Sequence, residues 1–113
     1  MNHQPDLFAN IPDKNAFVAF DRAAFRKGHI ERMMQRLAEA EAATTTPWTP
    51  ERTLVQTRLF FNHALWLPPE ERAEAIARYT CALERLGEHA VLAKVQEEVR
   101  LRDIRLAEEA LTQ

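Results

Sequence analysis

The sequence predicts an all-α fold, a small bundle of about four helices preceded by an extended N-terminal arm. Apolar residues recur every three to four positions over most of the 113 residues, and prolines and glycines divide the chain into helix-length stretches. No stretch alternates apolar and polar residues as a half-buried strand does. The length and the hydrophobic content of 46% indicate one globular domain with its own core. We expect the arm over residues 1–12 and a single helical domain over residues 13–113.

The first helix is predicted from Asp13 or Asn15 to about Ala43, where three threonines and Pro47 end it. One face of this helix is apolar on a 100° wheel: Ala16, Ala19, Phe20, Ala23, Ile30, Met34, Leu37 and Ala38. Lys27 interrupts the face, and the next residue, Gly28, costs about 1 kcal/mol inside a helix. Either the lysine extends to solvent or the helix breaks there, and we favour one helix with a weak point.

The second helix has a clear start signal, with Thr49 as N-cap, Pro50 in the first turn and Glu51 complementing the helix dipole. It is predicted to continue to about Leu67. Residues Leu59–Leu67 are apolar nearly all round, which is typical of a central helix or of an oligomer interface. We expect this helix to be the most buried.

The last two helices are separated by Gly87, a predicted helix-ending residue. The third helix starts at Pro68-Pro69, and its predicted inner stripe is Ala73, Ile76, Thr80 and Leu83. The fourth runs from about Glu88 to Leu111 with Glu98 and Arg102 as an i,i+4 ion pair. It carries two apolar stripes: Leu92, Val95, Val99, Leu106 and Ala110 on one side, and Leu101, Ile104 and Leu111 on another. Two stripes suggest more than one neighbour, and with the apolar second helix they predict a homodimer.

The residue inventory argues against an enzyme, a cofactor and a metal. One cysteine, Cys81, allows no internal disulfide framework and no zinc finger, and two glycines cannot build a phosphate-binding loop. No Glu-x-x-His or HExxH motif is present, so a metal site would need ligands from distant helices, and none is expected. We expect His63 to be a partly buried histidine bonded to a backbone carbonyl, Asn62 to pair within the core and Cys81 to be a small apolar residue at its edge.

A weak basic face on the first helix is the only feature suited to nucleic acid. Four arginines fall within about a third of a turn together with His29: Arg22, Arg26, Arg32 and Arg36. They could follow phosphates. Phe25 and Met33 interrupt the stripe, and the whole chain carries a net charge of -2. A solvated basic face is therefore the favoured interpretation, and direct nucleic-acid binding is not expected.

The arm contains the most specific motif, Gln4-Pro5-Asp6-Leu7-Phe8. It resembles the pentapeptide, roughly Gln-Leu-Ser/Asp-Leu-Phe, by which bacterial replication and repair proteins bind the DNA polymerase sliding clamp. Pro5 departs from the leucine preferred at its position, but it biases the preceding residue toward an extended backbone. The resemblance implies that Leu7 and Phe8 enter an apolar pocket on the clamp while the amide of Gln4 forms hydrogen bonds beside it.

Two functions follow from the arm. The first is a non-enzymatic accessory or regulatory protein of bacterial or phage replication or repair, held on the sliding clamp by Gln4, Asp6, Leu7 and Phe8. The second is a structural, protein-binding helical domain with no nucleic-acid role, in which Leu7, Phe8 and Ile11 pack on the bundle itself. We expect a cytoplasmic location, because no apolar run is long enough to span a membrane and Met1–Asn10 lacks the pattern of a secretion signal.

Overall fold

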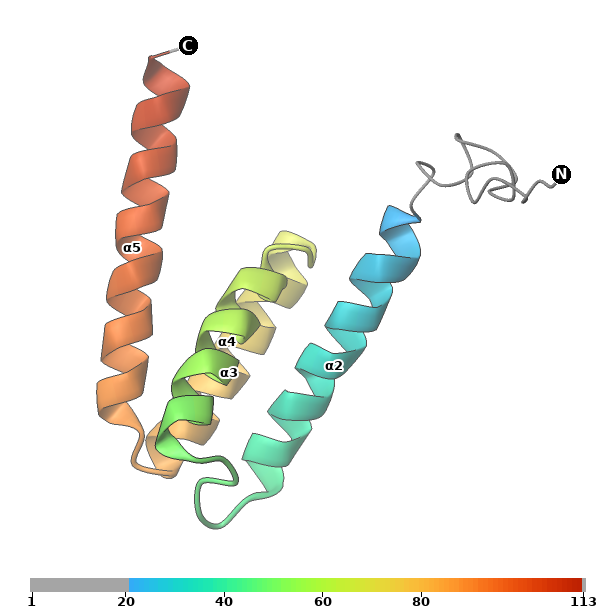
Figure 1. The fold of residues 1–113 in the computed structure, drawn as a ribbon, viewed down its shortest axis with the longest axis vertical. Coiled ribbons are helices and arrows are strands. Elements are labelled where there is room, and N and C mark those ends of the chain that lie inside the picture. Colours follow the sequence, from blue (N-terminus) through green and yellow to red (C-terminus); the bar gives the residue numbers. More distant parts are fainter. Residues whose placement is uncertain (1–20, 113) are drawn as a thin grey trace, which may run out of the picture.

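The computed structural model describes residues 21–112, which form four α-helices and no strand. The helices are α2 (Arg22–Ala42), α3 (Pro50–Ala64), α4 (Pro69–Arg85) and α5 (His89–Leu111) (Figure 1). The predicted all-α fold of about four helices is confirmed. The predicted arm over residues 1–12 lies outside the described residues.

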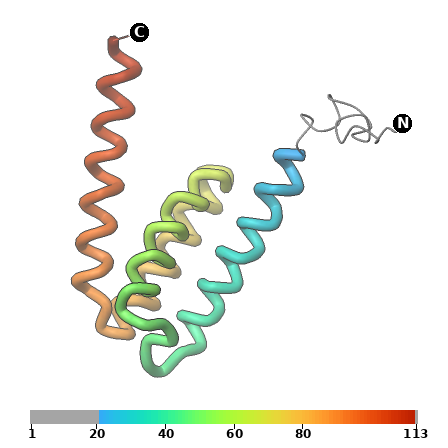
Figure 2. The backbone as a smooth tube through the Cα atoms, in the orientation of Figure 1, coloured from blue at the N-terminus to red at the C-terminus, as the bar shows by residue number. Residues whose placement is uncertain are grey.

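The central elements are α3 and α4, which pack on each other. Helix α2 contacts both of them, and α5 contacts both of them from the other side (Figure 2). This order follows from short connections between consecutive antiparallel helices. Because α2 and α5 flank the central pair, each of them has a face that no other described helix covers.

The core is built around two aromatic rings from the central helices. Phe60 of α3 stacks on Tyr79 of α4, with ring centroids 4.1 Å apart and planes 12° from parallel. Leu37, Met33 and Leu83 are fully buried around them. Helix α3 contributes more buried residues than any other described helix: Thr53, Gln56, Thr57, Phe60, Phe61 and Ala64. The prediction that the second helix is the most buried is therefore confirmed.

Helix α2 begins later than the periodicity predicted. Asp21 has an extended backbone and accepts a hydrogen bond from the Ala24 amide at 3.0 Å, so it is the N-cap. An unbroken helix from Asp13 or Asn15 is wrong for this reason. The helix continues through Gly28 without a break, as favoured. Its buried line is Met33, Leu37 and Ala40, so the predicted inner face was rotated toward Met34 and Ala38.

The second helix is shorter than predicted, because α3 ends at Ala64 and not at Leu67. The amides of residues 65–67 each bond to the carbonyl three residues before, which tightens the chain into a turn. Arg72 of α4 then donates to the carbonyls of Ala64, Leu65 and Leu67 at 3.1–3.2 Å. A guanidinium therefore satisfies the exposed carbonyls of this helix end.

The inner line of α4 also differs from the predicted stripe. Ala75, Tyr79, Ala82 and Leu83 are buried, whereas the predicted Ala73 is exposed and Ile76 and Thr80 are half-buried. Tyr79 decides the rotation, since it carries the largest side chain into the core. Gly87 ends the helix as predicted, with φ +83° and an amide that bonds to Glu84, while the Glu88 amide reaches back to Leu83.

Helix α5 is longer than the helices it packs on, and its C-terminal half projects beyond the bundle (Figure 1). Leu92 and Val95 are buried and Val99 is half-buried, but from Arg100 onward every residue except Arg102 is exposed. In Figure 1 this half of α5 extends past the ends of α3 and α4. The predicted Glu98–Arg102 ion pair does not form. Glu98 pairs with Arg58 of α3, and Arg102 donates to Asn62 at 3.1 Å.

Candidate functional site

The four residues of the clamp-like motif, Gln4, Asp6, Leu7 and Phe8, lie outside the described residues. The first described residue, the N-cap Asp21, is the thirteenth residue after Phe8. The remaining candidates are surfaces of the body: the seam between α2 and α3, two grooves that border α4, and the free half of α5.

The predicted basic face lies against α3 over part of its length. Arg26 stacks over the indole of Trp66, with 5.7 Å between its guanidinium carbon and the ring centroid. Arg32 contacts the Nδ1 atom of His29 at 3.2 Å, and Arg36 is half-buried. Arg22, at the start of α2, is exposed. Arg22, Arg26 and Arg32 are thus exposed, and Trp66, in the turn after α3, packs against the guanidinium of Arg26.

A cluster of aromatic and histidine rings lies where the first turns of α2 meet the end of α3. The rings of His63, His29 and Trp66 contact one another, with centroids 4.7 Å apart for the two histidines, 5.0 Å for His63 and Trp66 and 5.7 Å for His29 and Trp66. Phe25 packs edge-on against His29, with centroids 4.3 Å apart. The Nδ1 atom of His63 is buried and has no hydrogen-bond partner in the part of the chain that the structure describes. The expected bond from His63 to a backbone carbonyl is thus replaced by ring packing.

The pKa of His63 is lowered by this environment. Burial is the main cause, and the positive charges of His29, Arg36 and Arg32 add to it. A proton on His63 has no nearby carboxylate to compensate it among the groups that shift its pKa. The cluster therefore favours a neutral His63, which suits packing between rings rather than proton transfer.

Two consecutive hydrogen bonds in the core connect Tyr79 of α4 to Thr57 and Thr53 of α3. The Thr57 hydroxyl donates to the Thr53 carbonyl at 2.7 Å, so the Tyr79 hydroxyl is the donor in its 2.9 Å bond to Thr57. Burial raises the pKa of Tyr79 to about 12, although its bond to Thr57 and the charge of Arg36 act in the opposite direction. Tyr79 is thus a structural donor that stays protonated.

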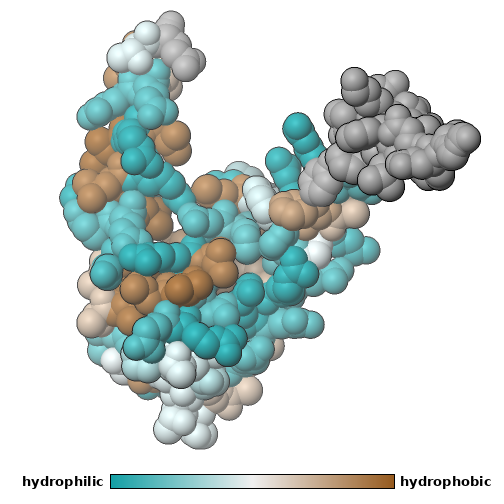
Figure 3. Space-filling model, viewed as in Figure 1, coloured by the Kyte–Doolittle hydropathy of each residue, from teal (hydrophilic) through white to brown (hydrophobic). Residues whose placement is uncertain are grey.

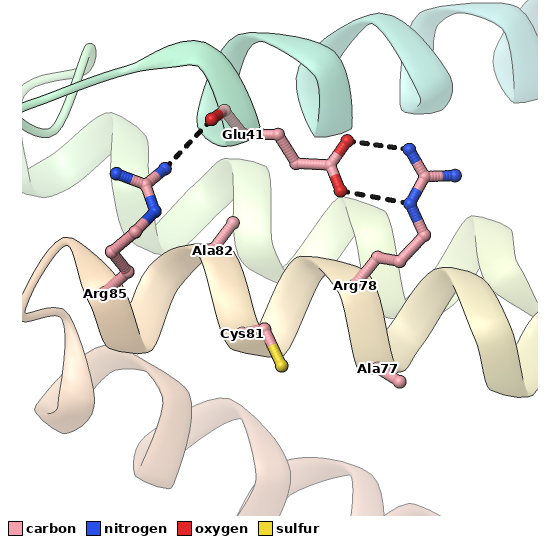
Figure 4. Close-up of a pocket in the computed structure, with 6 residues that line it drawn as sticks. All are labelled: Glu41, Ala77, Arg78, Cys81, Ala82 and Arg85. Carbon is pink, nitrogen blue, oxygen red and sulfur yellow. Dashed lines mark hydrogen bonds and ion pairs between the residues drawn. The ribbon is translucent and has the colours of Figure 1, made fainter.

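A groove of about 460 Å³ lies between the C-terminal end of α2 and α4 (Figure 4). Arg78 holds the Glu41 carboxylate with two hydrogen bonds of 3.0 and 2.7 Å, and Arg85 donates to the carbonyls of Ala40, Glu41 and Ala43. The bond from Arg78 lowers the pKa of Glu41. Glu41, Arg78 and Arg85 each have a partner, so the charged side chains of this groove join α4 to α2.

Cys81 lies in the same groove and is exposed, not at the edge of the core as expected. Asn62 is exposed as well, and its side-chain oxygen accepts from Arg102 instead of pairing within the core. Both errors have the same cause. The sequence period of each helix was correct, but its rotation about the axis was set by Tyr79 and Phe60, which the periodicity does not rank above other apolar residues.

A second groove, of about 260 Å³, lies between α2 and α4 and is mostly apolar. It is lined by Ile30 and Met34 of α2, by Leu67 of the turn before α4 and by Ala75 of α4. The charged residues that line it, Glu71, Glu74 and Arg78, also come from α4. Ile30 and Met34 belong to the predicted apolar face of the first helix, which packs only partly into the core.

Most of the large apolar side chains that are exposed in the described bundle lie on the free half of α5. Leu101, Ile104, Leu106 and Leu111 are 53%, 43%, 50% and 87% exposed, and the patch is visible on the projecting helix in Figure 3. Sequence analysis predicted both apolar stripes but not that one helix end leaves the bundle.

Comparisons of the chain with known protein families, with curated proteins and with solved structures found no match. Within residues 21–112, no group of three or more histidine, cysteine, aspartate or glutamate side chains is placed to hold a metal ion. No helix of the same range has the length and apolarity needed to cross a membrane.

Proposed function

We propose that this chain is a non-enzymatic accessory protein that binds the bacterial DNA sliding clamp through its N-terminal arm. The observation that carries the proposal is the motif Gln4-Pro5-Asp6-Leu7-Phe8, which matches the clamp-binding pattern at four of five positions. Its two large apolar residues stand in an otherwise polar segment, the arrangement expected of interface anchors.

The position of the motif supports a tether. Twelve residues separate Phe8 from Asp21, the first described residue, and a fully extended chain of this length spans at most about 40 Å. The arm can therefore enter a pocket on the clamp while the bundle stays outside it. A peptide of this size binds weakly alone, with a free energy of about 7–8 kcal/mol for a micromolar complex.

The test is calorimetric titration of a purified bacterial sliding clamp with the full chain and with a peptide of residues 1–12. We expect micromolar binding by both, and loss of binding in the Leu7→Ala, Phe8→Ala double variant, because the change removes most of the apolar burial. Ile11→Ala is the matched control, since it removes an apolar arm residue outside the motif. Absence of binding by the wild-type chain would refute the clamp function.

The alternative function, a structural interaction domain, is favoured by the apolar groove between α2 and α4. Ile30 and Met34 line it about two and about three turns from the start of α2, so an arm that folds back can place Leu7 and Phe8 there. The same double variant separates the two functions. Burial of both anchors predicts a loss of at least about 3 kcal/mol in the free energy of unfolding, whereas a free ligand predicts almost no change in Tm.

A further inference from the structure

The free half of α5, Arg100–Leu111, is a helix that the rest of the described bundle does not cover. Leu101, Ile104 and Leu111 form a line on the face turned away from Leu92 and Val95. A helical segment of twelve residues gains little stability from its own hydrogen bonds, and most helices in proteins are stabilised by packing an apolar face. Packing these three large apolar residues against a neighbouring helix would therefore stabilise the segment.

The charges along this segment indicate which helix fits. Residues 100–105 hold three arginines and one aspartate, a net charge of +2, and residues 106–111 hold Glu108 and Glu109, a net charge of -2. A second copy of the same segment is complementary only when it runs antiparallel, since a parallel copy places like charges side by side. A two-fold axis at the level of Leu106 brings Leu101 opposite Leu111 of the second copy and Arg105 next to its Glu108.

We propose that two copies of this chain associate through an antiparallel pair of α5 helices, with Leu101, Ile104 and Leu111 in the seam. The contact involves six large apolar side chains in total and belongs to the small, weak class of interfaces, so the dimer forms with a Kd on the order of 100 µM. This inference is independent of the clamp function. If both hold, the dimer presents two arms, and simultaneous engagement of two pockets strengthens binding without any new contact.

The first experiment is sedimentation equilibrium of the full chain from about 20 µM to about 1 mM, a range that brackets the expected Kd. Wild-type protein should shift from monomer toward dimer, and Ile104→Lys should weaken association at least about tenfold by placing a charge in the seam. Val55→Lys is the matched control, because Val55 is an apolar residue on α3 that is 50% exposed, close to the 43% of Ile104. Circular dichroism should show unchanged helix content in both variants. A monomer over the whole range, or a dimer equally weakened by both variants, would overturn the proposal.

The second experiment tests the orientation by disulfide trapping in a Cys81→Ser background, which removes the exposed native thiol. A mixture of Leu101→Cys and Leu111→Cys chains should give a cross-linked mixed dimer, because these positions are level in the antiparallel pair. The Leu101→Cys chain alone should cross-link poorly. Efficient cross-linking of Leu101→Cys to itself would show a parallel pair and contradict the proposed arrangement.

Discussion

At the scale of single residues, His63 and Tyr79 show how the interior treats polar groups differently. Tyr79 keeps its proton and uses it in a hydrogen bond to Thr57, so burial of the hydroxyl is compensated. The Nδ1 atom of His63 has no such compensation in residues 21–112, and three positive groups surround the ring. A proton on His63 therefore costs free energy in the folded state.

This asymmetry predicts a pH dependence of stability. Because the pKa of His63 is lowered in the folded state, the unfolded chain binds the proton more readily, and the free energy of unfolding falls as the pH drops below about 6.5. One proton limits the slope to about 1.4 kcal/mol per pH unit. The effect fades as the pH rises above 6.5, because the unfolded chain then also loses its proton at this residue.

Denaturant titrations between pH 7.5 and 5 measure this slope, and His63→Phe should reduce it while keeping the stack on Trp66. His89→Gln is the control variant, because His89 is exposed and lies outside the ring cluster around His63. The window is clear of the carboxylates Glu41, Glu97 and Glu98, whose pKa values are lowered and whose contributions are lost only at more acidic pH. A wild-type slope that survives in His63→Phe would contradict the assignment.

At the scale of helices, the two glycines have opposite roles. Gly28 lies inside α2, where an added Cβ would meet only the Arg32 guanidinium at 3.8 Å, an ordinary contact. Gly87 ends α4 with φ +83°, a backbone conformation that residues with a side chain rarely adopt. The first glycine is a weakness of its helix, and the second is required for the turn into α5.

Alanine substitution should therefore have opposite signs at the two glycines. Gly28→Ala should raise the free energy of unfolding by about 0.5–1 kcal/mol through helix propensity. Gly87→Ala should lower it by about 1 kcal/mol, because the space around Gly87 is open and only the backbone conformation is strained. Chemical denaturation of both variants is the measurement. A loss of stability in Gly28→Ala would show that the site needs glycine for another reason.

At the scale of the whole molecule, the bundle and the free half of α5 are separable. The last fully buried side chain is Val95, and the ion pair of Arg58 with Glu98 holds α5 to α3 close to the point where α5 leaves the bundle. The chain beyond Val99 contributes Arg102 to Asn62 and little else to the described fold. Folding and self-association should therefore depend on different parts of one helix.

A chain shortened after Val99 should fold with a free energy of unfolding within about 1 kcal/mol of the full chain and stay monomeric at high concentration. A chain shortened after Val91 loses Leu92 and Val95 from the core and should be destabilised by at least about 3 kcal/mol. Urea denaturation with sedimentation of both chains tests this. Unfolding of the first truncation would mean that the projecting half supports the bundle.

The sequence by itself determined the four helices of residues 21–112 and several of their ends. Thr49 and Pro50 start α3 as predicted, and Gly87 ends α4, because caps and special backbone conformations depend on neighbouring residues alone. It also identified the two apolar stripes of α5 and the motif from Gln4 to Phe8, which are patterns of sequence spacing. The end of α3 was missed, since the bonds from Arg72 that support it come from the next helix.

Only the tertiary structure decided the rotation of each helix and the partners of its charges. The stack of Phe60 on Tyr79 sets the rotation of α4 about its axis, so Ala75 is buried in the core and Cys81 is exposed. Arg58 and Glu98, like Arg78 and Glu41, come together only when helices about 40 residues apart pack side by side. Periodicity reports that a helix has an apolar side, but packing of the largest side chains sets the angle at which that side is buried.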